Sequence, residues 1–327
     1  MKKIGNQGLQ TADLGLGCMG MSDFYGSKST RNDAESIRTI QAALDKGITF
    51  LNTSDFYGSG HNELLIREAL RGRSDRPAIS VKTGILRTPT GGFAGLDTRP
   101  QALKNFAAQT LSKLGTDVID LYQPGRLDPS VPVEDTVGAI ADLIREGKVK
   151  YLGLSEVNSE QLRRAHTVHP VTAVEVEYSL ATRVLERDLL KTARELGVGI
   201  VAYGVLSRGL LSGSLSGSFD PTDFRAHSPR FSGENFSVNQ QKMSVLEHMA
   251  KDKGCTPAQL AIAWVLHQGS DILPLIGTTS TARLNENLAA QSIRLTSEEL
   301  NKLSDAYPEG TFAGERYAAQ QMGLVLR

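Results

Sequence analysis

Cysteine is scarce in this sequence, where Cys18 and Cys255 are the only two among 327 residues. Two such distant cysteines form neither a disulfide framework nor a metal-binding spacing, which excludes a cysteine-stapled secreted domain. No apolar run is long enough to span a bilayer, and the N-terminal MKKIGNQGLQ has no apolar segment behind its lysines. We therefore expect no signal peptide, no membrane partner and a cytoplasmic location.

An excess of either charge is also absent. The 36 basic and 36 acidic residues cancel to a net charge of zero. A balanced surface argues against nucleic acid as the main partner. The hydrophobic fraction of 40% and the charged fraction of 22% are ordinary for a globular protein, so a small-molecule ligand remains the expectation. Oligomeric state leaves no mark in the composition.

What the sequence does contain is a regular alternation of short apolar runs with segments of helical periodicity. The runs are almost free of polar residues, as parallel strands buried on both faces are. Helical segments end at glycines such as Gly47, Gly72 and Gly115, and Pro100 lies near the start of one. The pattern predicts an α/β fold, a (β/α)8 TIM barrel, as a single domain over residues 1–327. The predicted strands are residues 12–19, 48–52, 77–83, 117–123, 148–155, 171–179, 198–204 and 271–277.

One connection, residues 204–239, is unusually long. A loop of that length is typical of a functional lid or a disordered segment, and its place after a barrel strand favours the lid. A rival fold, the doubly wound dinucleotide-binding sheet, has the G-x-G-x-x-G match GLGCMG in its favour. That motif requires a helix opening on the last glycine and an acidic residue ending the second strand. Here a turn-like MSDFYGSKST follows, and the second strand ends in Asn52, so we set the rival aside.

Polar and aromatic residues gather at the predicted C-terminal strand ends, where barrel enzymes carry their chemistry. Lys82 places an ammonium in the otherwise apolar PAISVKT, and a buried lysine needs a partner or a function. Tyr57 follows the strand that ends at Asn52. An adjacent ammonium favours the phenolate, and lowering the pKa of a tyrosine by ~3 units requires ~4 kcal/mol. Such a tyrosine can protonate a carbonyl oxygen while hydride reaches the carbon. The structural alternatives are a polar turn for Tyr57 and a rim lysine that reaches water.

These residues lie within motifs that resemble the aldo-keto reductase family, close to its bacterial and plant branch. The similar stretches include LGLGCMGMSDFYG, DFYGSGHNE, SVKTG, LGTDVIDLYQPGRLDPSVPVEDTVGAIADLIREGKVKYLGLSE, VEYSL and IGTTSTARLNENLAA, and they extend over essentially the whole chain. The resemblance implies a (β/α)8 barrel without a metal that reduces aldehydes or ketones. It also implies NADPH as the cofactor, with NADH less favoured.

Four catalytic positions carry over from the resemblance, and two of them are altered. Tyr57 matches the acid and Lys82 the lysine, whereas Asn52 stands at the aspartate position and Gly125 at that of the carbonyl-binding histidine. Asn52 can still hydrogen-bond Lys82 but brings no charge, so we expect the pKa of the lysine to fall. If the ammonium stays charged, it lacks compensation and should lower the pKa of the tyrosine further. Gly125 is expected to leave space for water or a bulkier substrate, with water or Arg126 near the lost donor.

The resemblance also implies where the nicotinamide half of the cofactor binds. Ser155 matches the serine at the nicotinamide amide, and Tyr203 matches the aromatic residue that stacks on the ring. Glu156 and Glu175 replace the asparagine and glutamine of many members. Further expected contacts are Gly17, Met19, Leu206, Arg208, Gly209 and Leu210.

The adenosine half is expected at the start of the last barrel helix, because a helix N-terminus suits a phosphate. Thr279 and Ser280 stand where many relatives have lysine and arginine, so the preference for NADPH rests mainly on Arg283. The alternative is a Ser/Thr helix cap beside a solvated arginine. Further expected contacts are Gly277, Thr278, Glu286 and Asn287.

Histidines and the single tryptophan suggest no competing site. His166 and His169 have helical spacing but lack further metal ligands. His61 is a remote candidate for the missing donor, and Trp264 is expected in the core. Two classes of function stay open: an NADPH-dependent carbonyl reductase, and an NADPH-binding regulatory or sensor protein with little turnover.

Overall fold

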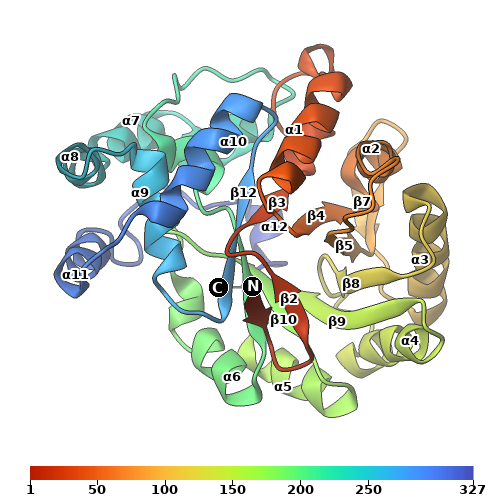
Figure 1. The fold of residues 1–327 in the computed structure, drawn as a ribbon. Coiled ribbons are helices and arrows are strands. Elements are labelled where there is room, and N and C mark those ends of the chain that lie inside the picture. The colour runs from red at the N-terminus through yellow and green to blue at the C-terminus, as the bar shows by residue number, and fades with distance from the viewer. Residues whose placement is uncertain (327) are drawn as a thin grey trace.

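The computed structural model describes residues 1–326, apart from the side chain of Lys28. Eight parallel strands close into a barrel in the order β10-β11-β12-β3-β4-β5-β8-β9, and helices surround it (Figure 1). The predicted (β/α)8 barrel is therefore confirmed. Its strands are β3 (Gly15–Gly17), β4 (Phe50–Ser54), β5 (Ala78–Thr83), β8 (Ile119–Pro124), β9 (Val149–Ser155), β10 (Ala173–Glu177), β11 (Gly199–Tyr203) and β12 (Ile272–Gly277).

The outer helices begin and end at the signals read from the sequence. Pro100 occupies the first turn of α3, and Gly115 ends that helix with φ 66°, a left-handed conformation that glycine adopts without strain. Asn32 caps α1 by accepting a hydrogen bond from the Glu35 amide. The helices after successive strands are α1 (Asp33–Asp45), α2 (His61–Ala69), α3 (Pro100–Leu114), α4 (Val133–Arg145), α5 (Ser159–Val168), α6 (Leu189–Leu196), α9 (Pro257–Leu266), α10 (Thr281–Leu288) and α11 (Ser297–Ala306).

Short elements depart from the predicted pattern. The helical sequence of residues 239–254 is divided between the end of α7 (Glu234–Gln241) and a second helix, α8 (Ser244–Asp252). Two small hairpins were not anticipated: β1 (Lys2–Ile4) with β2 (Leu9–Thr11), and β6 (Ile85–Arg87) with β7 (Phe93–Leu96). Strands of three or four residues are too short to show a periodicity in the sequence.

The long connection after β11 is ordered by short 3-10 helices, not by a single coil. They are η5 (Ser207–Ser212), η6 (Phe224–His227) and η7 (Pro229–Phe231). The Phe224 amide donates to the Phe24 carbonyl at 2.7 Å, and Asp223 accepts from the Gly26 amide at 2.7 Å. The connection therefore reaches the loop that follows β3. Among the described residues, no helix is long and apolar enough to cross a membrane.

The barrel interior changes from apolar to polar along the strands. At the N-terminal end, Phe50, Leu121 and Ala173 pack with Ile4 of the β1–β2 hairpin. Because side chains alternate in direction along a strand, the residues two positions further on share the interior. These positions, Asn52 on β4, Gln123 on β8 and Glu175 on β10, are polar. The C-terminal half of the interior therefore holds hydrogen-bonding groups.

Candidate active site

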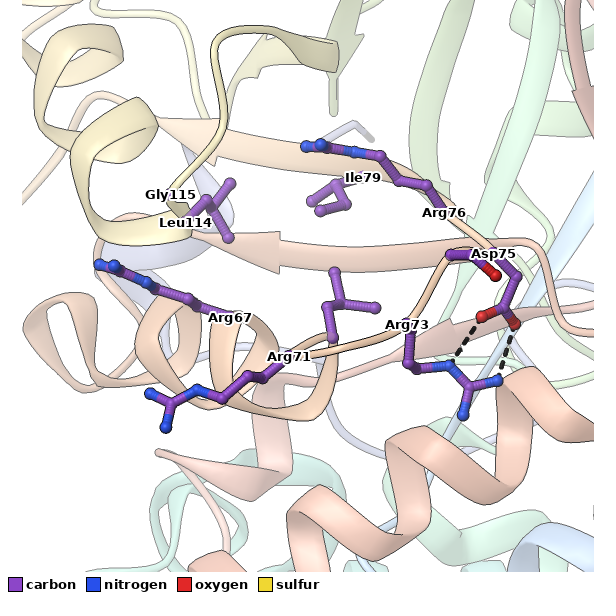
Figure 2. Close-up of a pocket in the computed structure, with 10 residues that line it drawn as sticks. Arg67, Arg71, Arg73, Asp75, Arg76, Ile79, Leu114 and Gly115 are labelled. Atoms are coloured by element: carbon purple, nitrogen blue, oxygen red, sulfur yellow. Dashed lines mark hydrogen bonds and ion pairs between the residues drawn. The ribbon is translucent and has the colours of Figure 1, made fainter.

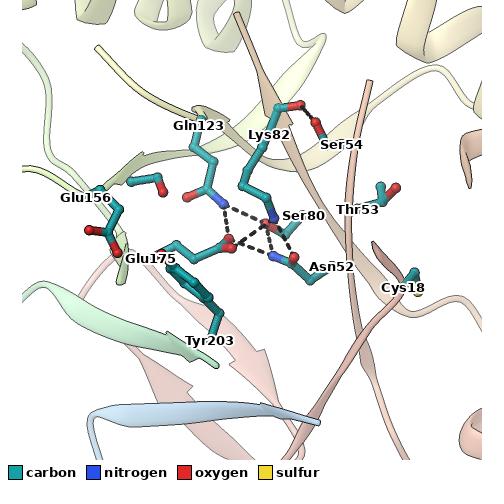
Figure 3. Close-up of polar contacts among 12 residues, drawn as sticks. Cys18, Asn52, Thr53, Ser54, Ser80, Lys82, Gln123, Glu156, Glu175 and Tyr203 are labelled. Atoms are coloured by element: carbon teal, nitrogen blue, oxygen red, sulfur yellow. Dashed lines mark hydrogen bonds and ion pairs between the residues drawn. The ribbon is translucent and has the colours of Figure 1, made fainter. Parts of the chain in front are cut away.

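A buried polar network crosses the interior of the barrel (Figure 3). Glu175 accepts hydrogen bonds from Lys82 Nζ at 2.8 Å, Asn52 Nδ2 at 2.7 Å and Gln123 Nε2 at 2.5 Å. Asn52 Oδ1 accepts a second bond from Lys82 Nζ at 2.5 Å. The side chains of Lys82 and Glu175 are only 6% and 3% exposed, so this ion pair is shielded from solvent. Four strands thus contribute one residue each to a single network.

The ion pair corrects one expectation from the sequence. Lys82 was expected to lack a compensating charge because Asn52 is neutral, and that is wrong, since Glu175 supplies the carboxylate from another strand. Burial lowers the pKa of Lys82, and the Glu175 carboxylate opposes that change. The ammonium and the carboxylate together form a neutral unit inside the barrel.

A glycine makes the network possible. A Cβ atom at Gly153 of β9 would lie 2.7 Å from Gln123 Oε1 and 3.1 Å from Gln123 Cβ. Any larger residue there would displace Gln123, which also donates to Ser80 Oγ at 3.1 Å. This role of Gly153 could not be predicted from the sequence, because Gln123 and Gly153 lie on neighbouring strands that meet only in the barrel.

Tyr57 lies at the mouth of the barrel, at the start of η3 (Tyr57–Gly60). Its ring packs edge-on against Phe56 at 5.0 Å and Phe24 at 5.9 Å between ring centroids. Lys82 Nζ lies 5.3 Å from the centroid of the tyrosine ring. Within residues 1–326, no hydrogen bond is made to the Tyr57 hydroxyl. The fold thus holds the ring firmly and leaves the hydroxyl free.

The pKa of Tyr57 differs in direction from the expectation. Burial raises the pKa well above its ordinary value, and Glu175 and Tyr317 raise it further, while Arg126 lowers it. The expected lowering by an uncompensated ammonium is wrong, because burial dominates and the Glu175 carboxylate, which pairs with Lys82, raises the pKa of Tyr57 further. Tyr57 is therefore fully protonated at neutral pH, as a proton donor must be.

The position of the missing histidine is not vacant. A Cβ atom at Gly125 would meet Ile85 Cδ1 at 3.2 Å and Phe56 Cε1 at 3.3 Å. The expectation of space for water or a bulkier substrate beside Gly125 is wrong, since these two side chains fill it. The neighbouring Arg126 lies 3.5 Å from Ser155 Oγ and forms no ion pair among the described residues. Its guanidinium donates to the Gly125 carbonyl and lies over the Tyr317 ring, so a cation stands beside the former donor site.

The residues expected to bind the cofactor lie around the same mouth. Gly277 at the end of β12 pairs in register with Gly17 at the end of β3. Arg283 is exposed on the first turn of α10, and its guanidinium has no partner within the described residues. The carboxylate of Glu286 is turned away, since it accepts from Thr256 Oγ1 at 2.8 Å. The others end a barrel strand, follow one, or lie just before or within α10: Met19, Ser155, Tyr203, Leu206, Arg208, Gly209, Leu210, Thr278, Thr279, Ser280 and Asn287.

A C-terminal segment, residues 312–326, covers the side of this mouth that Ser155 and Tyr203 line. The Arg316 guanidinium lies between Glu156, at 3.1 Å, and Glu177, at 3.5 Å. The Leu326 amide also donates to Glu156 at 2.8 Å, and Tyr317 Oη lies 2.8 Å from Tyr203 Oη. Glu156 is thus used to anchor this segment. No local pattern in the sequence predicts that this C-terminal segment covers the mouth.

A separate cavity of about 400 Å³ lies at the opposite end of the barrel (Figure 2). It is lined by Ile79 near the start of β5 and by four arginines. Two of these are paired with acids, Arg71 with Glu68 and Arg73 with Asp75, both at 2.7 Å. This cavity has no contact with the polar network.

We expect Asp55→Asn to remove a pH dependence of stability. Burial raises the pKa of Asp55 from 3.8 to about 7. The hydrogen bond from the Thr83 hydroxyl and the charge of Lys113 oppose this rise, whereas the charge of Glu63 adds to it. Because the folded pKa lies above the unfolded one, the stabilising contribution is complete below pH 3.8 and is lost as the pH rises through about 7. Across that window the free energy of unfolding of the wild type should fall by on the order of 2–4 kcal/mol relative to that of the variant.

Urea unfolding at pH 5 and pH 8 measures this difference. The exposed Asp135→Asn serves as the matched control and should show no such change. An equal gap between wild type and Asp55→Asn at both pH values would contradict the assignment.

Comparison with known proteins agrees with this geometry. The chain matches the sequence model of the Aldo/keto reductase family over residues 13–308. It belongs to the aldo/keto reductase family. A relative, probable aldo-keto reductase 1 from Glycine max, is 41% identical over 320 residues, which are 96% of this chain and 91% of the relative. The protein is accordingly an NAD(P)H-dependent oxidoreductase.

Solved structures share the barrel of this aldo/keto reductase. The glycerol dehydrogenase AKR11B4 from Gluconobacter oxydans has a TM-score of 0.82 at 27% identity, covering 90% of this chain and 91% of that one. An aldo/keto reductase from Klebsiella pneumoniae, solved in complex with NADP and acetate, has a TM-score of 0.74 at 24% identity, covering 97% and 98%. The fold is thus the one that this family uses.

Proposed function

We propose that this aldo/keto reductase reduces the carbonyl group of an aldehyde or ketone with NADPH, with Tyr57 as the general acid. The observation that carries the proposal is the free hydroxyl of a buried tyrosine, whose ring centroid lies 5.3 Å from the Lys82 ammonium. The hydroxyl oxygen is not one of the fully buried atoms that lack a partner in the described chain, so it keeps some exposure at the mouth of the barrel. A hydroxyl without a partner in the described chain is available to a ligand.

The residues at the mouth fit a dinucleotide phosphate. Arg208 Nη1 is buried without a partner among the described residues. The backbone there has positive φ at Ser207, Arg208 and Gly209, a turn that can present amides to an anion. Arg283 lies beside the N-terminus of α10, where a phosphate is favoured. We therefore assign the pyrophosphate to the Arg208 turn and the 2′-phosphate to Arg283.

The chain's own contribution is to hold and deliver a proton. NADPH, when bound, supplies the hydride to the carbonyl carbon. Tyr57 stays protonated because burial raises its pKa, and it gives its proton as negative charge develops on the carbonyl oxygen. Lys82 and Arg126 then stabilise the phenolate that remains. The rings of Phe24 and Phe56 keep water from the tyrosine.

The proposal is tested by following a label. The protein is incubated with NADPH deuterated at the transferred position and with a panel of reactive aromatic aldehydes and bulky ketones. The products are then analysed by mass spectrometry. Deuterium on the carbinol carbon supports the reductase. If the protein binds NADPH by calorimetry yet labels no carbonyl in the panel, the regulatory or sensor role is favoured instead.

The Arg283→Ala substitution should weaken the binding of NADPH and leave the binding of NADH unchanged. Loss of one charge-assisted contact to the 2′-phosphate is expected to raise the KM for NADPH by ~10–100-fold. NADH lacks that phosphate, so its KM should stay the same. Arg294→Ala, which removes another exposed arginine, is the control. Parallel losses with both cofactors would show that Arg283 acts on something other than the phosphate.

A further inference from the structure

Lys82 is held by a carboxylate from a distant part of the barrel. Glu175 lies on β10, which is separated from β5 by β8 and β9. Within residues 1–326, Glu175 is the only acid in ion-pair contact with Lys82. We propose that Glu175 is a positioning residue for the carbonyl reduction, because it fixes the Lys82 ammonium beside Tyr57 while Asn52 serves as the neutral hydrogen-bonding partner. The inference rests on the proposed function and reassigns Glu175 from the cofactor to the lysine.

The geometry permits one acid at these two positions, not two. Asn52 Nδ2 lies 2.7 Å from Glu175 Oε2, and Asn52 Oδ1 accepts from Lys82. An aspartate at position 52 would set two carboxylates at that distance against one ammonium, and like charges so close disfavour joint ionisation. An amide at one position and an acid at the other satisfies every donor. Asn52 and Glu175 therefore form a matched pair.

Other groups near Lys82 cannot replace Glu175. Arg126 is itself a cation and disfavours the ammonium. Burial raises the pKa of Cys18 to about 12, so its thiol is neutral at physiological pH. Tyr57 is neutral as well. Among residues 1–326, Glu175 is the one anion in contact with Lys82 that opposes its desolvation, and its loss should discharge or displace the lysine.

The test is a charge exchange. Glu175→Gln alone should lower kcat by ~100-fold, with little change in the KM for NADPH, because a buried ammonium is left without its anion. The exchange variant Asn52→Asp/Glu175→Gln keeps one acid beside Lys82 and should recover kcat to within ~5-fold of wild type. Lys82→Met/Glu175→Gln removes the pair altogether. It should regain thermal stability relative to Glu175→Gln but not activity.

A second readout needs neither cofactor nor substrate. The Lys82 side-chain resonance, assigned with Lys82→Met, is titrated by NMR in the wild type, Glu175→Gln and the exchange variant. Glu175→Gln should lower the pKa of Lys82, and the exchange should raise it again. This readout stands even if no carbonyl is reduced, so failure of the proposed function is distinguishable from failure of this inference.

Two outcomes would overturn the assignment outright, and a third pattern would count against it. One is wild-type kcat and an unchanged Lys82 titration in Glu175→Gln. The other is an exchange variant that is folded yet no better than Glu175→Gln in both readouts. A purely structural role would restore stability in every charge-balanced variant without restoring kcat in the exchange, and that pattern counts against the inference too.

Discussion

Replacing Tyr57 by phenylalanine should lower kcat for carbonyl reduction by ~10²–10⁴-fold, the usual contribution of a general acid. The fold should not change, because the hydroxyl makes no hydrogen bond within the described chain and the ring keeps its contacts with Phe56 and Phe24. The KM for NADPH should also be close to that of the wild type. Steady-state kinetics and thermal unfolding measure the two effects separately.

A second buried tyrosine provides the matched control. Tyr122 is fully buried, and its hydroxyl donates to the Leu103 carbonyl at 3.0 Å on the outer side of the barrel wall. Tyr122→Phe removes that bond and should cost about 1 kcal/mol of stability while sparing kcat. The two variants therefore have opposite phenotypes. Retention of wild-type turnover by Tyr57→Phe would reject the tyrosine as the acid.

The barrel was predictable because each of its strands and helices is indicated by residues that are close together in the sequence. Each strand is a short apolar run, and several helices close at a glycine such as Gly115, so the alternation can be inferred from neighbouring residues. Lys82 and Tyr57 were also identifiable, since a polar group in or after an apolar run is conspicuous. Element ends shifted by a few residues, as at β3, where the strand covers only Gly15–Gly17.

The electrostatics of the site were not predictable, because they depend on contacts between distant strands. Lys82 and Glu175 are 93 residues apart in the chain and meet only when the barrel closes. Without that pair, the sign of the change in the pKa of Tyr57 was reasoned from the lysine alone and came out wrong. The surroundings of Gly125 were unpredictable for the same reason, because Ile85, which belongs to an unanticipated hairpin, fills the space beside this glycine. Arg316 belongs to a segment without periodicity.

Arg316→Met should be strongly destabilising for the C-terminal segment. The guanidinium is 4% exposed and is shared by Glu156 and Glu177, whose side chains are fully buried. Removing one partner of a buried ion pair costs about 3–5 kcal/mol, because the remaining charge stays desolvated. Arg208 still contacts Glu177 at 3.3 Å, so Glu156 bears most of this loss. The molecule can reduce the cost by releasing residues 312–326, which would expose Glu156 to water.

Two measurements distinguish release from global unfolding. Amide exchange should quicken in residues 312–326 while the barrel strands keep their protection, and urea unfolding should shift by less than the full cost if the segment detaches first. Arg187→Met is the control, since it breaks an exposed pair with Glu309 at 2.7 Å and should cost at most about 1 kcal/mol. Equal stability and equal exchange in the two variants would show that Arg316 does not anchor the segment. Faster exchange confined to residues 312–326 would mean that the cover over Ser155 and Tyr203 opens independently of the barrel.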